Sequence, residues 1–125
     1  MNIIFNYEKS GSFVSAKGVR RVVNRKKYDT DTADCLWKEE YEHKWKVGTD
    51  VLGEDYFDHT HCGVALFRKK NGEYFEYDVE WHKDDYERFY YPTVTIKPLT
   101  EEEAKDLTEK YAPDDYIDIF GDVDE

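Results

Sequence analysis

Gly63 to Glu80 reads G-V-A-L-F-R-K-K-N-G-E-Y-F-E-Y-D-V-E and carries the clearest structural signal in the chain. Two runs of alternating apolar and polar residues, typical of β-strands, flank the dipeptide Asn71-Gly72. Asn and Gly tolerate the positive φ angles of a type I′ turn, so the stretch predicts a hairpin with a two-residue loop, in which Leu66 faces Tyr77. That register predicts one buried apolar face and one face mostly in contact with water. The buried face would hold Val64, Leu66, Phe75, Tyr77 and Val79, and the wet face Phe67, Lys69, Tyr74, Glu76 and Asp78.

On the C-terminal side of the hairpin, residues 93–97 alternate as a further strand, which we expect to end at Pro98. Thr100 and Glu103 then form the capping-box pattern T-E-E-E, which predicts the start of a helix. Pro113 predicts a second, short helix over residues 114–120. The apolar positions of both helices predict packing on the sheet.

On the N-terminal side, residues 18–27 alternate valine with arginine and lysine, which indicates a strand with charged ends. Residues 28–33 are turn and cap formers whose Asp and Thr side chains can bond nearby backbone N–H groups. Residues 35–47 fit a strand better than a helix, because a helix would place Glu40 and Lys44 within its apolar stripe. Residues 48–60, acidic and dotted with glycine, predict a long loop, and loops of this length lean towards function or mobility.

Together these elements predict an α+β fold, an antiparallel β-meander sheet packed by C-terminal helices. We expect one domain over residues 1–125, in which residues 1–18 form an N-terminal hairpin or arm and residues 122–125 a loose acidic tail. No run of about 18 apolar residues occurs and the start lacks the features of a signal peptide, which favours a cytosolic protein without a membrane segment. In that setting Cys35 and Cys62 are expected as reduced thiols or metal ligands.

The net charge of −11 is unevenly distributed along the chain. Residues 1–28 carry seven Lys or Arg residues against one Glu, whereas residues 100–125 carry two basic and eleven acidic residues. A field of this size repels nucleic acid from most of the surface and attracts basic partners. The alternative is that the acidic residues only keep a small protein soluble.

His59-Thr60-His61-Cys62 is the strongest candidate for a metal site, because three potential zinc ligands lie within four residues. His43 is the expected fourth ligand, with Cys35 or His82 as alternatives. The spacing matches no zinc-finger signature, and Cys62 could equally be a small buried residue at the start of a strand. If zinc binds, we expect a structural role. We expect no enzyme, since no phosphate-binding loop or activated nucleophile stands out.

Three segments carry a resemblance to a known family: residues 26–33 (K-K-Y-D-T-D-T-A), residues 65–75 (A-L-F-R-K-K-N-G-E-Y-F) and residues 96–105 (I-K-P-L-T-E-E-E-A-K). In this order they resemble a group of small proteins encoded by phages and mobile elements of Gram-positive bacteria. Some members or close relatives look like anti-CRISPR inhibitors of type II-A Cas9. The resemblance covers most of residues 26–121 and implies the fold more strongly than the activity. It supplies no catalytic residue.

The resemblance implies a stoichiometric inhibitor that binds Cas9 in the cytoplasm of a bacterial host and blocks DNA loading or cleavage. An acidic protein can dock on the positively charged channels of Cas9, and exposed aromatic residues would anchor the contact. The aromatic residues of 37–45 and 81–91 are expected mainly in the core, or as anchors if exposed. The expected contact residues are Asp50, Glu54, Asp55, Tyr56, Phe57, Asp58, Asp84, Asp85, Tyr86, Glu87, Asp114, Asp115 and Asp118.

Two alternatives remain open. In the first, the chain is a mobile-element accessory protein that binds another host protein through the same acidic surface. In the second, it is a small nucleic-acid-binding protein that contacts phosphates with Arg20, Arg21, Arg25, Lys26 and Lys27. A charged edge strand that discourages aggregation would explain the same basic residues without a ligand.

Overall fold

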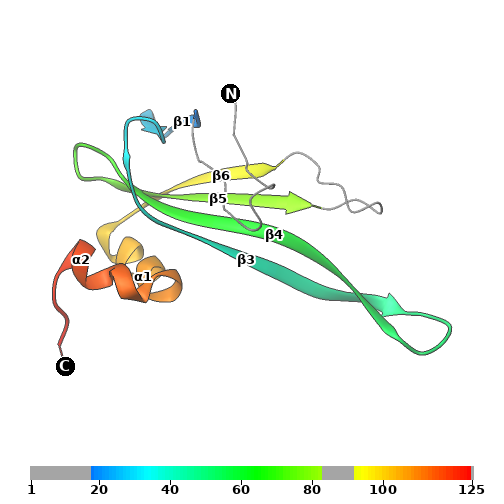
Figure 1. Ribbon diagram of the computed structural model, residues 1–125. Coiled ribbons are helices and arrows are strands. Elements are labelled where there is room, and N and C mark those ends of the chain that lie inside the picture. Colours follow the sequence, from blue (N-terminus) through cyan, green and yellow to red (C-terminus); the bar gives the residue numbers. More distant parts are fainter. Residues whose placement is uncertain (1–17, 83–91, 125) are drawn as a thin grey trace.

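The computed structural model describes residues 18–82 and 92–124 (Figure 1). A four-stranded antiparallel sheet has the order β3-β4-β5-β6, and a separate two-stranded sheet pairs β1 with β2. The strands are β1 Arg20–Val23, β2 Lys26–Asp29, β3 Asp34–Thr49, β4 Asp55–Arg68, β5 Tyr74–His82 and β6 Thr93–Leu99. The helices are α1 Glu101–Tyr111, the 3₁₀ turn η2 Pro113–Asp115 and α2 Tyr116–Phe120. The predicted α+β fold, a meander packed by C-terminal helices, is confirmed.

The loop between β4 and β5 differs from the predicted type I′ turn. Lys69 N donates to Glu73 O at 2.8 Å, Gly72 N donates to Lys69 O at 2.9 Å, and Gly72 has a φ of 93°. This is a three-residue loop that ends in a left-handed glycine, the second commonest way to close a hairpin. The extra residue shifts the register by one, so that Ala65 rather than Leu66 lies opposite Tyr77.

The one-residue shift exchanges the two faces of β4 relative to β5, and both faces are buried. One face is covered by the β1–β2 hairpin, and its core contains Val19, Tyr28, Ala65, Phe67, Phe75, Tyr77 and Val79. The other face is covered by the helices, and its core contains Trp37, Val64, Leu66, Ala104 and Ala112. The prediction of one wet face is therefore wrong at this end of the sheet, where three layers enclose two small cores (Figure 1).

Residues 18–27 form most of a hairpin, so the prediction of a single strand in this region is wrong. Asn24 and Arg25 have φ angles of 52° and 64°, so the type I′ turn lies here. Closing the hairpin places Tyr28 on the sheet, where its ring meets Phe75 edge to face at 5.5 Å between centroids. Arg25 adopts a conformation that non-glycine residues rarely occupy, and only the preceding Asn signals it in the sequence.

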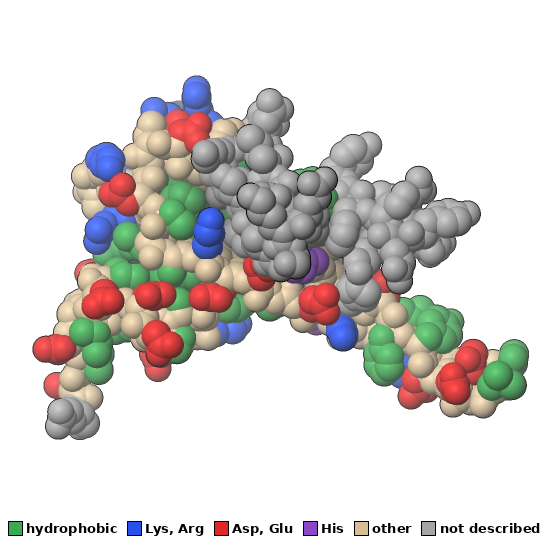
Figure 2. All heavy atoms as spheres, in the orientation of Figure 1, with side chains coloured by type: hydrophobic (Ala, Val, Ile, Leu, Met, Phe, Trp, Pro, Cys, Tyr) green, Lys and Arg blue, Asp and Glu red, His purple; other side chains and the backbone are tan. Residues whose placement is uncertain are grey.

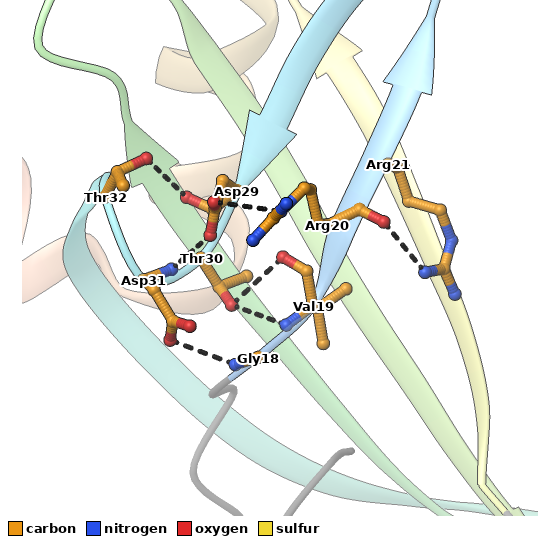
Figure 3. Close-up of polar contacts among 8 residues, drawn as sticks. All are labelled: Gly18, Val19, Arg20, Arg21, Asp29, Thr30, Asp31 and Thr32. Carbon is orange, nitrogen blue, oxygen red and sulfur yellow. Dashed lines mark hydrogen bonds and ion pairs between the residues drawn. The ribbon is translucent and has the colours of Figure 1, made fainter. Parts of the chain in front are cut away.

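Side chains from Asp29 to Thr32 anchor this hairpin, which confirms their predicted role in a turn (Figure 3). Asp29 Oδ1 accepts a hydrogen bond from Asp31 N at 2.8 Å, and Asp31 Oδ1 accepts one from Gly18 N at 2.9 Å. Thr30 Oγ1 accepts from Val19 N at 3.2 Å. Asp29 and Thr30 are buried, so these bonds satisfy polar groups that would otherwise cost free energy in the core.

The helix layer matches its sequence prediction. Thr100 caps α1, with Glu103 N donating to Thr100 Oγ1 at 3.1 Å and Thr100 N donating to Glu103 Oε1 at 3.0 Å. Trp37 Nε1 donates to Thr108 Oγ1 at 2.9 Å, a buried bond that ties the helix to β3. One boundary was wrong: β6 continues through Pro98 to Leu99. Proline is tolerated in an edge strand, because the N–H group that it lacks would point away from the neighbouring strand and make no hydrogen bond in the sheet.

Candidate functional site

The β3–β4 hairpin extends beyond the rest of the sheet. The predicted strand over residues 35–47 is confirmed, but the predicted long loop over residues 48–60 is wrong, since β3 runs to Thr49 and β4 begins at Asp55. The last pair between β4 and β5 joins Thr60 to His82. Residues 44–59, here called the arm, therefore pair only with each other in the described sheet, and Figure 1 shows them reaching past the ends of β5 and β6.

A tight loop closes the arm. Asp50 N donates to Glu54 O at 2.8 Å, Gly53 N donates to Asp50 O at 3.1 Å, and Gly53 has a φ of 84°. This repeats the geometry of the β4–β5 loop, and in both loops the left-handed glycine is followed by glutamate. Asp50 Oδ1 also accepts hydrogen bonds from Leu52 N and Glu54 N, each at 2.9 Å. The carboxylate of Asp50 thus stabilises the loop, and its Oδ1 atom is already occupied by hydrogen bonds within the chain.

A glycine with a close neighbour shapes the middle of the arm. The register shifts between Lys46 and Gly48, which leaves Val47 as the extra residue of a bulge. A Cβ atom placed on Gly48 would lie 2.7 Å from the hydroxyl oxygen of Tyr56. The ring of Tyr56 therefore lies across Gly48, and any larger residue at position 48 would displace it.

The arm exposes a concentration of large apolar side chains. Val51 is fully exposed, Leu52 is 84 % exposed, and none of the other four is below 40 %. Figure 2 shows hydrophobic side chains towards the end of the arm with acidic side chains beside them. The six residues are Trp45, Val47, Val51, Leu52, Tyr56 and Phe57. A concentration of exposed apolar side chains of this kind is typical of an interaction site.

The charges of the arm are mostly negative, with Lys44 and Lys46 against four acidic residues. Lys46 Nζ lies 3.1 Å from Asp55 Oδ1, which also accepts a hydrogen bond from Thr49 Oγ1 at 2.9 Å. The arm thus combines apolar anchors with an acidic surround. This suits a partner that offers an apolar pocket within a basic surface.

The structure separates the predicted contact residues into three groups. Asp50, Glu54, Asp55, Tyr56, Phe57 and Asp58 all lie on the arm. Asp114, Asp115 and Asp118 lie on η2 and α2, at the opposite end of the molecule from the end of the arm (Figure 1). Asp84, Asp85, Tyr86 and Glu87 lie outside the described residues. Sequence reasoning missed Val47, Val51 and Leu52, although an apolar pair in the middle of an acidic turn was a usable signal.

The predicted zinc ligands are divided between the two faces of β4. His43 pairs with Thr60 and Tyr41 with Cys62, so His43 does return to the 59–62 segment as expected. Side chains alternate along a strand, however, and Cys62 and His61 point to opposite faces. Cys62 lies inside β4 rather than at its start.

The remaining candidates do not complete the site. His61 Nε2 lies 3.7 Å from Glu40 Oε2, and Cys35 lies near the other end of β3, opposite Phe67. The side chains of His59 and His82 are not described. Within the described residues no three His, Cys, Asp or Glu side chains form a group that could hold a metal ion. Zinc binding stays a prediction without geometric support.

A groove at the base of the arm contains two side chains whose pKa is raised by burial. Its lining residues are Tyr41, His43, Trp45, Thr60, Cys62 and Glu80. Burial raises the pKa of the Cys62 thiol and of the Tyr41 hydroxyl, so both keep their protons at neutral pH. A protonated thiol is a poor nucleophile. Nucleophilic attack by Cys62 is therefore disfavoured in this groove.

The basic N-terminal segment and the β4–β5 loop form one surface, here called the basic end. Lys26, Lys27, Lys69 and Lys70 line the same hollow together with Glu73. Most of these charges are paired: Lys26 Nζ lies 2.6 Å from Glu73 Oε2, Lys69 Nζ 3.2 Å from Glu73 Oε1, and Lys70 Nζ 2.9 Å from Asp34 Oδ1. Figure 2 shows Lys and Arg side chains at this end, away from the arm.

Comparison of the chain with protein-family models, with curated proteins and with solved structures gave no match. In the described part of the chain, none of the helices has the length and apolar character needed to cross a membrane.

Proposed function

We propose that this protein is a non-enzymatic, stoichiometric inhibitor that binds Cas9 of a type II-A system through the arm. The observation that carries the proposal is the set of six exposed apolar side chains on a protruding, acidic hairpin. Large apolar and aromatic residues supply most of the free energy of protein–protein binding when a partner buries them. A narrow hairpin can enter a groove that the three-layered body of the protein cannot.

Charge supports a basic partner. The chain carries a net charge of −11, and the acidic residues of the arm lie around its apolar end. Cas9 holds its guide and target in positively charged channels. In the proposed complex the acidic residues steer the arm towards such a channel and the apolar residues bind there, which would exclude DNA or prevent cleavage. This proposal places the protein in the cytoplasm of a bacterial host.

The three segments that carry the family resemblance belong to the body of the protein. We infer that the arm, which lies outside them, determines which partner is bound. The three segments pack against each other, through the Lys26–Glu73 ion pair and the Tyr28–Phe75 ring contact among others. The end of the arm lies outside all three segments. A shared scaffold with a variable hairpin is a common way to change partners, because loops tolerate sequence change better than packed cores.

Co-purification with type II-A Cas9 and a DNA cleavage assay test the proposal. We expect excess protein to stop cleavage at a one-to-one stoichiometry. The double variant Val51→Ser/Leu52→Ser should weaken binding about tenfold or more, because it removes two exposed anchors. Ile117→Ser/Val123→Ser, at two exposed apolar positions of the C-terminal region, is the matched control and should bind like the wild type.

Each outcome decides between named alternatives. Cas9 that neither binds nor loses activity would overturn Cas9 as the partner and favour an accessory protein with another host target. Binding that survives Val51→Ser/Leu52→Ser but fails in the control variant would move the contact to the C-terminal helices, where Asp114, Asp115 and Asp118 lie.

A further inference from the structure

Within the described residues, β3 is an edge strand along its whole length. The sheet order is β3-β4-β5-β6, and in the described chain β3 pairs with β4 alone. Its other edge is 16 residues long and carries backbone N–H and C=O groups without a neighbouring strand among the described residues. An edge of this length is a template for pairing with a further strand, and proteins usually protect it or use it.

The outer half of β3 has an ordered arrangement of charges. On one face the sequence runs Glu40, Glu42, Lys44, Lys46, so that acidic residues precede basic residues. On the other face Tyr41, His43 and Trp45 follow one another, and both Tyr41 and Trp45 are 40 % exposed. When two copies of such a strand pair antiparallel, the acidic residues of one copy lie opposite the basic residues of the other.

We propose that a second copy of the chain pairs with this edge, antiparallel and about a two-fold axis through His43. The two sheets would then form one continuous sheet across an isologous interface. Pairing about His43 places Glu42 opposite Lys44 and Glu40 opposite Lys46, each twice by symmetry. On the other face it places Tyr41 opposite Trp45, an aromatic cross-strand pair that buries both rings.

The charges select this register over its neighbours. Side chains keep their face across a two-fold axis, so the axis must pass through a residue position. Centring the pairing on Glu42 would oppose Glu42 to its own copy and Lys38 to Lys46. Centring it on Lys44 would oppose Lys44 to its own copy. The register about His43 opposes only unlike charges among these residues.

The same side chains have partners within one chain. Glu42, Lys44 and Lys46 stay accessible, whereas the side chain of Glu40 is only 18 % exposed and would have to turn outward to meet Lys46 of a second copy. Lys44 Nζ lies 3.8 Å from Glu42 Oε2 and Lys46 Nζ 3.1 Å from Asp55 Oδ1, and all four side chains are between 45 % and 65 % exposed. Glu40 Oε2 lies 3.7 Å from His61 Nε2. Exposed ion pairs contribute little and can be shared with or replaced by contacts across the interface.

Sedimentation equilibrium and light scattering of the full chain test the proposal. We expect the wild type to be a dimer at high concentration. The variants Glu40→Lys/Glu42→Lys and Lys44→Glu/Lys46→Glu should each be monomeric, with dimer dissociation constants raised at least about tenfold, because each opposes like charges. An equimolar mixture of the two variants should restore a dimer, since every opposed pair is again unlike. Asp106→Lys/Glu109→Lys, on the exposed face of α1, is the charge-matched control for Glu40→Lys/Glu42→Lys and should leave the dimer intact.

Cysteine crosslinking tests the register. In a Cys35→Ser/Cys62→Ser background, His43→Cys should form an interchain disulfide on mild oxidation, because opposed Cα atoms in an antiparallel pair lie about 4.5–5.5 Å apart, within disulfide range. Lys46→Cys should not, since its copy would lie six residues along the strand. Circular dichroism confirms that each variant is folded.

A wild type that stays monomeric at every concentration would overturn the proposal. So would a dimer that survives both charge reversals, or folded variants that fail to associate when mixed. These outcomes do not depend on Cas9, which none of the measurements contains.

Discussion

At the scale of single residues, the sheet holds two carboxyl groups in opposite states. Hydrogen bonds from Lys26, Asn71 and Lys69 lower the pKa of Glu73 to about 2, at a half-buried position in the β4–β5 loop. Burial, together with the neighbouring carboxyl of Glu76, raises the pKa of Asp78 to about 8. Environment rather than residue type thus decides which carboxyl is charged at neutral pH.

Asp78 predicts a pH dependence of stability. Its folded pKa of about 8 lies above the ordinary value of 3.8, so between these values the folded protein retains a proton that the unfolded chain has released. The free energy of unfolding should therefore fall as pH rises from about 4 to about 8. Asp78→Asn should be more stable than the wild type at pH 8, by about 1 kcal/mol because solvent screens this partly exposed group, and similar to it at pH 4.

Urea unfolding of both proteins across this pH range measures the difference. Glu109→Gln, which removes the same charge from an exposed helix position, is the control. A difference between Asp78→Asn and the wild type that does not change with pH would contradict the assignment of the proton to Asp78.

At the scale of elements, the arm is a hairpin that depends on its own loop. Its strands pair with no third strand within the described sheet, so the order of the arm depends on the pairing of its two strands and on the loop at Asp50. The two cores of the protein depend little on this loop. Regions of this kind open independently of global unfolding.

We expect Asp50→Ala to loosen the arm without unfolding the protein. The change removes the acceptor of two backbone hydrogen bonds, which should lower the local opening free energy by about 1 kcal/mol. Amide hydrogen exchange should therefore accelerate about fivefold within residues 49–56. Amides of β5 should exchange as in the wild type, and Asp50→Asn, which keeps an acceptor oxygen, should have a smaller effect. Equal acceleration in β5 would show that the arm and the core unfold together.

At the scale of the whole molecule, basic side chains gather at one end of the sheet, where the acidic C-terminal helices lie on the other face (Figures 1 and 2). The basic end lies over one end of the sheet, and the acidic arm extends from the other (Figures 1 and 2). Two carboxylates, Glu73 and Asp34, nonetheless pair with three of the four lysines in the hollow of the basic end and offset part of their charge. The folded arrangement weakens the electrostatic case for nucleic-acid binding that the sequence of residues 20–27 suggests.

We therefore expect the wild type not to retard DNA or RNA in mobility-shift assays near physiological salt, because paired lysines on a protein of net charge −11 attract phosphates weakly. Asp34→Asn/Glu73→Gln leaves these lysines without counter-charges and should produce weak, salt-sensitive binding. Retardation by the wild type that Lys27→Glu/Lys70→Glu abolishes would instead favour the nucleic-acid alternative.

Local signals in the sequence determined much of this protein. The capping box of α1 follows from hydrogen bonds within a few residues. The strand over residues 35–47 and the strands β4 and β5 follow from the alternation of side chains along the chain. The sequence also grouped six expected contact residues that the structure places on the arm, although the predicted loop that carries them is a strand hairpin; their contact with a partner stays a prediction. Asn71-Gly72 predicted the position of the turn correctly. The predicted loop length of two residues was wrong, because a left-handed glycine closes both two- and three-residue loops.

Only the tertiary structure decided which faces are buried and where the sheet ends. Val64 and Leu66 lie on the opposite face from Ala65 and Phe67, and both sets are apolar, so the alternation of β4 could not say which layer covers which face. Among the described residues β5 pairs with β4 only as far as Thr60, which leaves the arm beyond it, and the sequence of β4 does not indicate where its neighbour ends. Strand alternation likewise divides Cys62 from His61, which stand side by side in the chain. Residue order determines the elements, but exposure and proximity depend on long-range pairing.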